Sequence, residues 1–407
     1  MPECILRAMG RAPIDYTGDE FRLILAECGE GLRRVFNTEQ AVLAYASSGH
    51  GAWEAAVANI CSPGDKVLLI ESGFFSTNWG RFAAALGLNV ETLANDWRCG
   101  ADAAALEFRL KEDRGHAIKA VMLVHNETST GVANRCQEVR RAIDGARHPA
   151  LFLVDVISSL GCFEVAMDDW QADVVVGGSQ KGLMLPVGMS FTGVSAKALD
   201  AVEKCKMPRA YWDWRRLLTG TRQTGFHGTA PVHFFFALQE ALRMLEEEGL
   251  EQVYARHHRL AESTRRAVHA WQRNDGPEIY ACDPRTQSDS VTAVLVPEGH
   301  DAEEIRRICL ERFNVSLGPG LDPLKGRLFR IGHMGDLNEP MIVGTLAAVE
   351  MAMQIAGIPH GKGGVAAAID YLASVEPADS HAASKRFDPS PIEIRVNGSD
   401  RPVGVAV

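Results

Sequence analysis

The sequence predicts an α/β protein with a mostly parallel sheet, followed by a smaller α+β domain. Short apolar runs alternate with helical patterns over the first half of the chain, and the pattern changes in the second half. The chain has 407 residues, enough for two to three domains, and 46% of them are hydrophobic. This composition excludes wholesale disorder, a collagen-like repeat and a disulfide-stapled miniprotein.

Four apolar runs are predicted to be buried parallel strands, because each is bounded by glycine, proline or charged residues. They lie at residues 66–70, 120–124, 150–154 and 173–176. Periodicity alone does not separate such a run from a buried helix segment. Helical patterns precede and alternate with the runs, at residues 19–36, 51–60, 78–86 and 134–146, the last with Asn134 as its N-cap.

Two long helices are expected next, at about residues 231–248 and 251–271. Beyond them the sequence predicts strands at 290–296 and 326–331 and helices at 302–312 and 341–356. We therefore expect a large domain over residues 1–250 and a small C-terminal domain over 251–372. Residues 373–407 are rich in proline, serine and charged residues and are predicted to be a mobile tail with one short strand at 392–396.

The charge balance of the chain argues against two classes of partner. Its 42 basic and 52 acidic residues give a net charge of −10, which repels nucleic acid and anionic membranes. No apolar run is long enough for a membrane span and no signal peptide pattern opens the chain, so we expect a cytoplasmic protein. Nine cysteines without a CxxC pair indicate reduced thiols that mostly fill the core, and no metal site is predicted.

A turn of small residues at 47–51 runs directly into a predicted helix. Small residues let backbone N–H groups approach a phosphate, and a helix N-terminus adds positive potential. An ordinary N-cap explains the turn equally well. The turn is not GxGxxG, and no acidic residue follows at the distance that a dinucleotide ribose needs, so a nicotinamide dehydrogenase is disfavoured.

Two predicted strands end next to residues that carry chemistry. Asp155 follows one run, and Lys181 follows another among small residues, in Gly-Gly-Ser-Gln-Lys-Gly. Taken alone, Asp155 is as well explained as an N-cap and Lys181 as a surface lysine. Together with the small-residue turn, they occur in the order and spacing of a pyridoxal phosphate (PLP) enzyme.

Longer motifs sharpen this interpretation. Over roughly residues 1–372 the chain resembles the class V aminotransferases, which are PLP enzymes of fold type I, and within them the serine/alanine–glyoxylate branch. The motifs that carry the resemblance are SSGHGAWEAA (47–56), HNETSTGV (125–132), VDVISSLG (154–161), GSQKGLMLPVG (178–188), MPRAYWDW (207–214), ARHHRLAESTR (255–265) and FRIGHMGDLNE (329–339). MPRAYWDW and GIPHGKGGV (357–365) are most similar to serine–glyoxylate aminotransferases.

The resemblance implies a role for each matching position. Lys181 would bind PLP covalently, Asp155 would pair with its pyridine nitrogen, and Arg330 would bind the substrate α-carboxylate as a planar fork. The other implied contacts are Ser48, Gly49, His50 and Gln180 with the phosphate, Phe75 stacked over the ring, Thr128 near the ring oxygen, and Thr229 with the phosphate in the second subunit of a homodimer.

Two positions depart from the family pattern. Phe226 stands where relatives often have a phosphate-binding tyrosine, which predicts weaker phosphate affinity. The chain begins Met-Pro-Glu-Cys, where relatives carry a Gly-Pro-Gly-Pro-Thr-like segment that lines the substrate pocket. We therefore expect a few native residues to be missing before Met1.

The activity implied by the resemblance is amino transfer from a small L-amino acid, with serine favoured, to glyoxylate, giving glycine and a 2-oxo acid such as hydroxypyruvate. Alanine or aspartate as donor and pyruvate as acceptor remain open. A cysteine desulfurase is disfavoured because no cysteine occurs between Leu310 and Leu372. A non-catalytic PLP-binding regulator is the remote alternative, since no basic DNA-binding module is appended.

Overall fold

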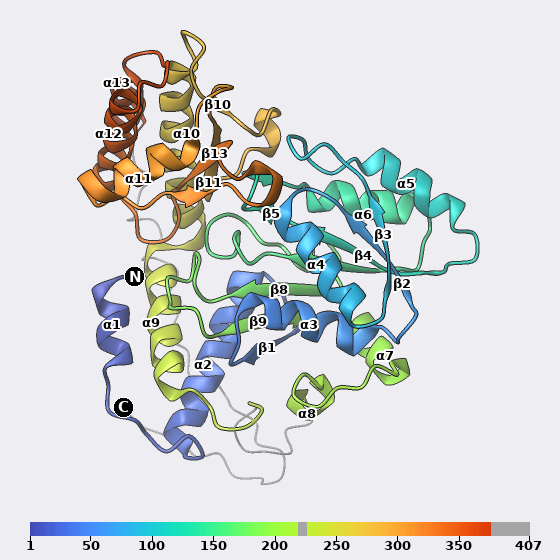
Figure 1. The fold of residues 1–407 in the computed structure, drawn as a ribbon. Coiled ribbons are helices and arrows are strands. Elements are labelled where there is room, and N and C mark those ends of the chain that lie inside the picture. Colours follow the sequence, from blue (N-terminus) through green and yellow to red (C-terminus); the bar gives the residue numbers. More distant parts are fainter. Residues whose placement is uncertain (219–225, 376–407) are drawn as a thin grey trace.

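The larger of two main sheets lies at the centre of the structure, a computed structural model that describes residues 1–218 and 226–375. Its strands are β1 (Ala41–Tyr45), β2 (Lys66–Ile70), β3 (Asn89–Leu93), β4 (Ile118–Val124), β7 (Leu151–Asp155), β8 (Val174–Gly178) and β9 (Ser190–Val194). They lie in the order β1-β9-β8-β7-β4-β2-β3 (Figure 1). The five strands from β8 to β3 are parallel, and β9 pairs antiparallel with both β8 and β1. The predicted mostly parallel sheet is confirmed.

Helices cover both faces of this sheet. Successive residues of a strand point to opposite faces, so each central strand contributes side chains to a core on either side. In β7, Phe152 and Val154 belong to one hydrophobic core, whereas Leu151 and Leu153 belong to the other. Both faces of the sheet are therefore buried from solvent, which explains why the central strands are continuous apolar runs. The helices of this part are α1 (Glu3–Met9), α2 (Asp19–Phe36), α3 (Gly49–Ile60), α4 (Phe74–Ala85), α5 (Ala103–Glu112), α6 (Cys136–Gly145), α7 (Ala196–Lys204), α8 (Trp214–Leu218) and α9 (Val232–Glu248).

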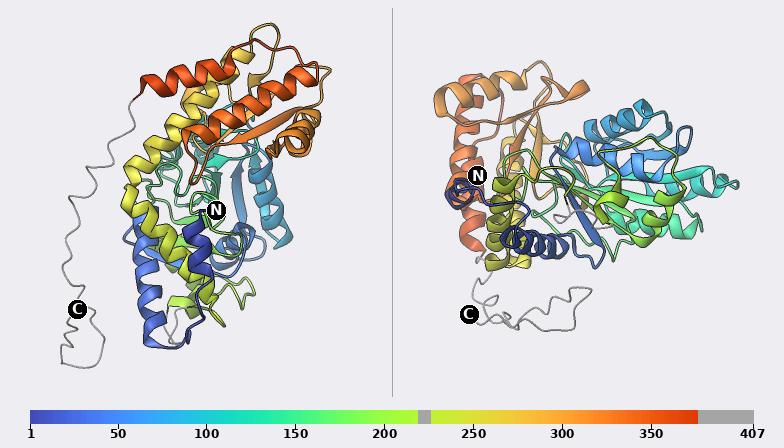
Figure 2. Two further views of the ribbon diagram at one scale, coloured as in Figure 1. Left: turned by 90° about the vertical axis from the view of Figure 1, so that its left-hand side faces the viewer. Right: turned by 90° about the horizontal axis from the view of Figure 1, so that it is seen from below.

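A second sheet is built from the C-terminal part of the chain. Its strands are β10 (Glu278–Ile279), β11 (Val291–Leu295), β12 (Gly318–Pro319) and β13 (Leu328–Gly332), all antiparallel in the order β10-β11-β13-β12. Around it lie α10 (Leu250–Trp271), α11 (Ala302–Phe313), α12 (Glu339–Ile355) and α13 (Gly364–Ser374). Figure 2 shows α9 and α10 following one another from the larger sheet toward the smaller one, with α1 packed against α9.

Two predicted elements have the observed bounds, and most of the others differ by one or two residues at an end. The helix predicted at 19–36 and the strand at 66–70 have the observed bounds of α2 and β2. Helix α4 begins at Phe74, four residues before its predicted start. The prediction of Asn134 as an N-cap is wrong: its side chain instead accepts from Ala101 N and donates to Val124 O.

The C-terminal prediction can be compared only in part. Helix α13 continues to Ser374, one residue past the predicted start of the tail. The rest of that tail, with its strand at 392–396, lies outside the described residues. Within the described ranges, none of the helices has the length and apolarity required to cross a membrane.

Candidate active site

Asp155 and Lys181 lie at the same edge of the larger sheet. Asp155 is the last residue of β7, and Lys181 follows the end of β8 by three residues. The two strands are parallel neighbours, with Asp155 opposite Val176. Because the carboxyl ends of parallel strands meet at one edge, the topology brings both groups to the place where open α/β sheets bind ligands.

The Asp155 carboxylate is buried and held by two donors. Its Oδ1 accepts from the N–H of Ile157 at 2.6 Å, and its Oδ2 accepts from Nε1 of Trp53 at 2.7 Å. Burial raises the pKa of Asp155 to about 7, and the charge of Glu127 adds to this effect, while the two hydrogen bonds and Lys181 oppose it. A cation placed beside this carboxyl would stabilise its ionised form.

Lys181 lies in an environment that disfavours its charged form. Burial lowers the pKa of Lys181, and the charge of Arg330 lowers it further, whereas Cys162 and Asp155 act in the opposite direction. A lysine with a lowered pKa carries a larger fraction of neutral amine near neutral pH, which is the form that acts as nucleophile and base.

The N-terminus of α3 approaches this edge of the sheet. Ser48 is the N-cap, and a Cβ added to Gly49 would lie 2.3 Å from Cδ1 of Ile157. Only glycine therefore allows the helix to come so close to the segment after Asp155. The first N–H groups of a helix have no acceptor within it, so this end can bind an anion such as a phosphate.

Aromatic rings gather beside this helix end. The His50 ring contacts Trp53 with centroids 4.6 Å apart and Phe82 at 5.5 Å. Phe75, in the first turn of α4, lies 6.4 Å from Trp53 between ring centroids. Because the His50 side chain packs in this cluster, its backbone N–H is the group at the helix end that is suited to an anion.

A polar group beside Lys181 lacks a partner. Oε1 of Gln180 is buried and accepts no hydrogen bond from the described residues. A buried amide oxygen without a donor costs free energy that a ligand N–H or O–H would recover. The anion-binding end of α3 and the Asp155 carboxyl fit a ligand that carries both a phosphate and a protonated ring nitrogen.

Arg330 on β13 of the smaller sheet reaches the turn that follows the short strand β5. Its Nη1 donates to the carbonyl of Thr128 at 2.8 Å and its Nε to the carbonyl of Pro319 at 2.8 Å. Thr128 follows the short strand β5 (Asn126–Glu127), and its Oγ1 donates to Oγ of Ser158 at 2.8 Å. Burial lowers the pKa of Arg330. The two backbone carbonyls that Arg330 bonds carry no net charge. A carboxylate ligand would pair with this half-buried guanidinium and supply a negative charge.

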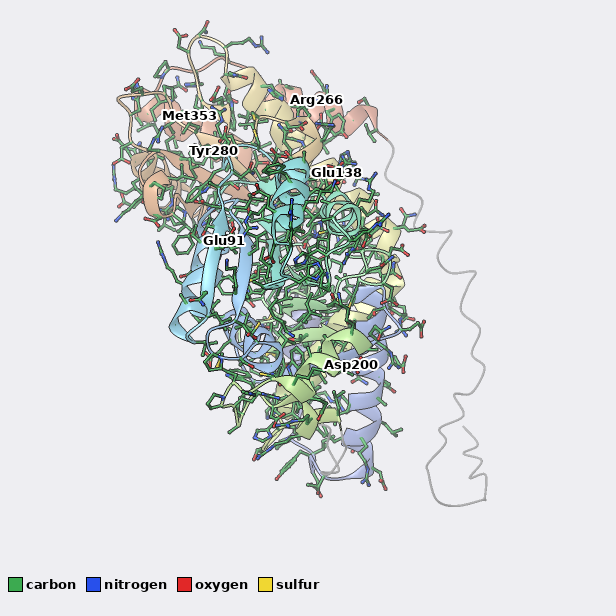
Figure 3. All side chains as sticks on the ribbon, turned by 90° about the vertical axis from the view of Figure 1, so that its right-hand side faces the viewer. Glu91, Glu138, Asp200, Arg266, Tyr280 and Met353 are labelled. Carbon is green, nitrogen blue, oxygen red and sulfur yellow. The ribbon has the colours of Figure 1, made fainter. Side chains whose placement is uncertain are left out.

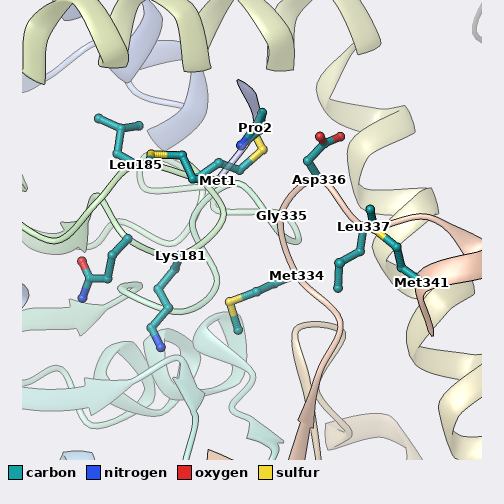
Figure 4. A pocket seen from close by; sticks show the side chains of 11 residues that line it. Met1, Pro2, Lys181, Leu185, Met334, Gly335, Asp336, Leu337 and Met341 are labelled. Atoms are coloured by element: carbon teal, nitrogen blue, oxygen red, sulfur yellow. The ribbon is translucent and has the colours of Figure 1, made fainter. Parts of the chain in front are cut away.

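A pocket of about 440 Å³ opens on the other side of Lys181. Figure 4 shows Lys181 and Met334 extending from its wall, with Met1, Pro2 and Leu185 across from them. The first residues of the chain therefore line the space next to the lysine.

Two residues that the sequence singled out, Thr229 and Phe226, lie apart from this cluster. Thr229 lies exposed in the segment before α9. Phe226 is 4% exposed and packs edge-on against Phe235, with centroids 5.8 Å apart. Among the described residues of one subunit, Thr229 makes no hydrogen bond or ion pair with Lys181, Asp155 or Arg330.

Sequence reasoning missed two side chains that shape the site. Trp53 lies in the core with 1% of its surface exposed, and its indole N–H also donates to Asp155. Its position four residues after Gly49 in the same helix places both on one helix face, which was a usable signal. Glu127 was not singled out, although its carboxylate accepts from the backbone N–H groups of Phe75 and Ser76.

Gly182, the residue after Lys181, offers a stability prediction. A Cβ there would lie 2.3 Å from the carbonyl oxygen of Leu160 and 2.5 Å from the carbonyl carbon of Gly161, so backbone would have to move. We expect Gly182→Ala to lower the free energy of unfolding by about 1–3 kcal/mol. Gly344→Ala in α12 is the matched control: nothing lies within 4 Å of its added Cβ, and it should gain up to about 1 kcal/mol. Chemical denaturation measures both; equal effects would contradict the close approach at Gly182.

Comparison with known proteins gives a consistent result. The class V aminotransferase family model matches residues 10–322. The chain is 42% identical to an L-aspartate–glyoxylate aminotransferase of Paracoccus denitrificans over 91% of this chain and 93% of that protein. It is 42% identical to a serine–glyoxylate aminotransferase of Methylorubrum extorquens, with the same coverage. A solved ureidoglycine–glyoxylate aminotransferase from Bacillus subtilis superposes with a TM-score of 0.84 at 27% identity, over 92% of this chain and 96% of that one.

Proposed function

The chain belongs to the class V aminotransferases, and we propose that it transfers the amino group of a small L-amino acid, L-serine first, to glyoxylate. The products would be glycine and a 2-oxo acid such as hydroxypyruvate. The observation that carries the proposal is that Asp155, at the carboxyl edge of the larger sheet, and Arg330, on β13 of the smaller sheet, both lie close enough to Lys181 to act on its charge. Relatives about 40% identical named for glyoxylate transamination support the acceptor.

The family implies PLP as cofactor, and the residues present fit it. The α3 N-terminus at Ser48, Gly49 and His50 would hold the phosphate with the Gln180 amide, and Asp155 would hold the proton on the ring nitrogen. Phe75 would face the ring, and Thr128 would lie near its oxygen. When bound, PLP supplies an acceptor for the electron pair released at the substrate α-carbon.

The protein's own side chains would position the substrate and move its proton. Arg330 would bind the α-carboxylate as a fork, which fixes the α-carbon relative to Lys181. The neutral Nζ of Lys181 would take the α-proton of the amino donor. When glyoxylate is the substrate, the same amine would deliver a proton to the α-carbon of the glycine that forms. Because donor and acceptor would use the same arginine and lysine in turn, ping-pong kinetics are expected.

The pocket beside Lys181 favours serine over aspartate as donor. Among the described residues that line it, Lys181 and Asp336 are the charged side chains. The β-carboxylate of aspartate would meet the carboxylate of Asp336, whereas a serine hydroxyl carries no charge to be repelled. Aspartate remains the second candidate, because one relative is named for it.

A homodimer is part of the proposal. Thr229 is exposed in a single subunit, and class V relatives led us to expect it at the phosphate of the cofactor in the second subunit. We propose that dimer formation buries it there. Analytical ultracentrifugation of the holoenzyme tests this: a monomer with full activity would contradict it.

The test of the proposed function is the absorbance spectrum of the purified protein with PLP, before and after L-serine. A visible band that is lost on adding L-serine and returns on adding glyoxylate would support both substrates. L-alanine and L-aspartate, added separately, are the comparison donors. A band that only L-aspartate bleaches would assign the second candidate, and the absence of any band after PLP addition would overturn the proposal.

Arg330→Gln should raise KM for both the amino donor and glyoxylate by about tenfold or more, because each carries a carboxylate that a single charge-assisted pair would hold. Arg307→Gln is the control, because Arg307 pairs with Glu311 on the exposed side of α11. Steady-state kinetics with each substrate varied measures the effect. An unchanged KM in Arg330→Gln would remove this residue from the carboxylate site.

A further inference from the structure

The strongest unassigned feature near the site is the buried carboxylate of Glu127. It is 0% exposed and accepts four hydrogen bonds. Two come from Ser129, through N–H at 3.1 Å and Oγ at 2.6 Å. The other two come from the first turn of α4, through Phe75 N–H at 3.3 Å and Ser76 N–H at 3.0 Å. A negative charge at a helix N-terminus is stabilising, and here it joins two segments about 50 residues apart in sequence.

The contact is close on both sides. Gly73, which precedes α4, has φ of 156°, and a Cβ there would lie 2.5 Å from Cγ of Glu127 and 2.5 Å from Oγ of Ser129. The helix start can therefore approach Glu127 only because residue 73 is glycine. Glu127 immediately precedes Thr128, whose carbonyl accepts from Arg330. One side chain thus joins the segment that carries Phe75 to the turn that holds Arg330.

We propose that Glu127 is a positioning residue that fixes the first turn of α4 to the turn carrying Thr128 and so holds Phe75 toward the cofactor. This inference rests on the proposed function for the cofactor and its reaction, but the contact itself exists without either. Glu127 touches neither substrate nor cofactor in this account: it acts through Phe75 and Thr128, and its charge also raises the pKa of Asp155.

The test combines a cofactor-free readout with a cofactor-binding readout. In Glu127→Gln, one oxygen of the carboxylate becomes an NH₂ group that faces N–H donors, so hydrogen exchange at Phe75 and Ser76 should accelerate by about tenfold or more in the cofactor-free protein. The dissociation constant for PLP should rise by up to about tenfold, the value of one displaced aromatic contact. Glu311→Gln, on the exposed side of α11 where Glu311 pairs with Arg307, should change neither.

A double-mutant cycle with Phe75→Leu isolates the route. If Glu127 acts through Phe75, the loss of PLP affinity from Glu127→Gln should largely disappear in the Phe75→Leu background. Exchange rates at residues 75 and 76 equal to wild type, or an additive loss of affinity, would overturn the proposal. If the wild-type protein bound PLP but did not transaminate, the proposed function would fail. Hydrogen exchange and the dissociation constant for PLP would still test the role of Glu127. Glu127→Asp keeps the charge and replaces Glu127→Gln if that variant does not fold.

An independent observation concerns two cysteines far apart in sequence. Cys99 and Cys282 have sulfur atoms 3.3 Å apart, and the N–H of Cys282 donates to the carbonyl of Arg98 at 3.0 Å. Cys282 is exposed and Cys99 is half-buried, unlike the buried thiols that fill the core. Figure 3 labels Tyr280, two residues before Cys282, on the same side of the molecule as Glu91 of β3. The cysteine pair therefore brings the loop after β3 into contact with the loop after β10.

We infer that Cys99 and Cys282 form a redox modification site, oxidised by a low-molecular-weight disulfide. The Cys282 thiolate attacks one sulfur of that disulfide, which releases one small thiol and leaves a mixed disulfide. The Cys99 thiolate then attacks the Cys282 sulfur and releases the second small thiol. The two cysteines together lose two electrons and two protons, which the small disulfide takes up. The sulfurs need approach by only about 1 Å to reach bonding distance.

Treatment of the holoenzyme with oxidised glutathione tests this inference. In wild type, the thiols titrated after denaturation should fall by two from the nine cysteines, with one cross-linked peptide pair containing Cys99 and Cys282 and no glutathione adduct. Cys99→Ser should instead retain glutathione on Cys282, while Cys205→Ser, whose thiol bonds backbone carbonyls elsewhere, should behave as wild type. A persistent glutathione adduct on Cys282 in wild type, or nine thiols after treatment, would overturn the inference.

Discussion

Replacement of Lys181 by alanine is expected to lower the turnover of serine and glyoxylate by about a thousandfold or more, because it removes the amine that we propose carries the α-proton. PLP should still bind, held by the α3 N-terminus and Asp155, but without the visible band of the lysine-bound cofactor. The measurements are steady-state kinetics and the absorbance spectrum of the same preparation. The variant should fold, since Lys181 lies in a desolvated site that penalises its charge.

The matched control for this variant is Lys204→Ala on the exposed side of α7. It removes the same side chain from a position without a link to the site and should leave turnover within about twofold, as expected for an exposed surface substitution. Turnover of Lys181→Ala close to that of Lys204→Ala would refute the assignment of the lysine. Loss of PLP binding together with turnover would indicate that Lys181 serves the cofactor's affinity and leave its role in proton transfer without support.

The sequence predicted the part of the site that depends on local pattern. Buried parallel strands are continuous apolar runs, so β7 and β8 could be located, and the polar residues that end them could be placed at one edge. Strand β9 escaped this criterion although it is fully buried. Its sequence, Ser-Phe-Thr-Gly-Val, places polar and small residues where a continuous apolar run was sought, and Ser190 bonds Ser47 at 2.6 Å.

The remainder of the site depends on contacts between distant segments, which one sequence does not reveal. Arg330 and Thr128 are 202 residues apart and Cys99 and Cys282 are 183 apart. The start of α4 was predicted too late for the same reason, because the N–H groups of its first turn donate to Glu127 and Ser129, which lie about 50 residues away in the sequence. Local rules predicted the elements, whereas the resemblance to the family, and not spacing, suggested Phe75, Thr128 and Arg330.

Replacement of Asp155 by asparagine should have the second largest effect. An amide cannot keep the cofactor's ring nitrogen protonated, so turnover at pH 7 should fall by about a hundredfold or more. The amide nitrogen would also face the N–H of Trp53, which now donates to Oδ2. Asp200→Asn is the control, since Asp200 is exposed on α7 (Figure 3). Equal turnover in the two variants would contradict the role of Asp155.

The cofactor-free protein gives Asp155 a second, independent signature. Burial raises its pKa to about 7, from 3.8 in the unfolded chain. Between these pH values the folded state binds more protons than the unfolded state, so this group lowers the free energy of unfolding as pH rises from about 4 to about 7, by at most roughly 4 kcal/mol. Asp155→Asn should remove that decline, whereas Asp200→Asn should retain it. Urea denaturation of cofactor-free protein across this range measures the slope, and parallel slopes would show that the carboxyl is ionised throughout. Since PLP places a cation beside Asp155, binding it to wild type should flatten the same slope.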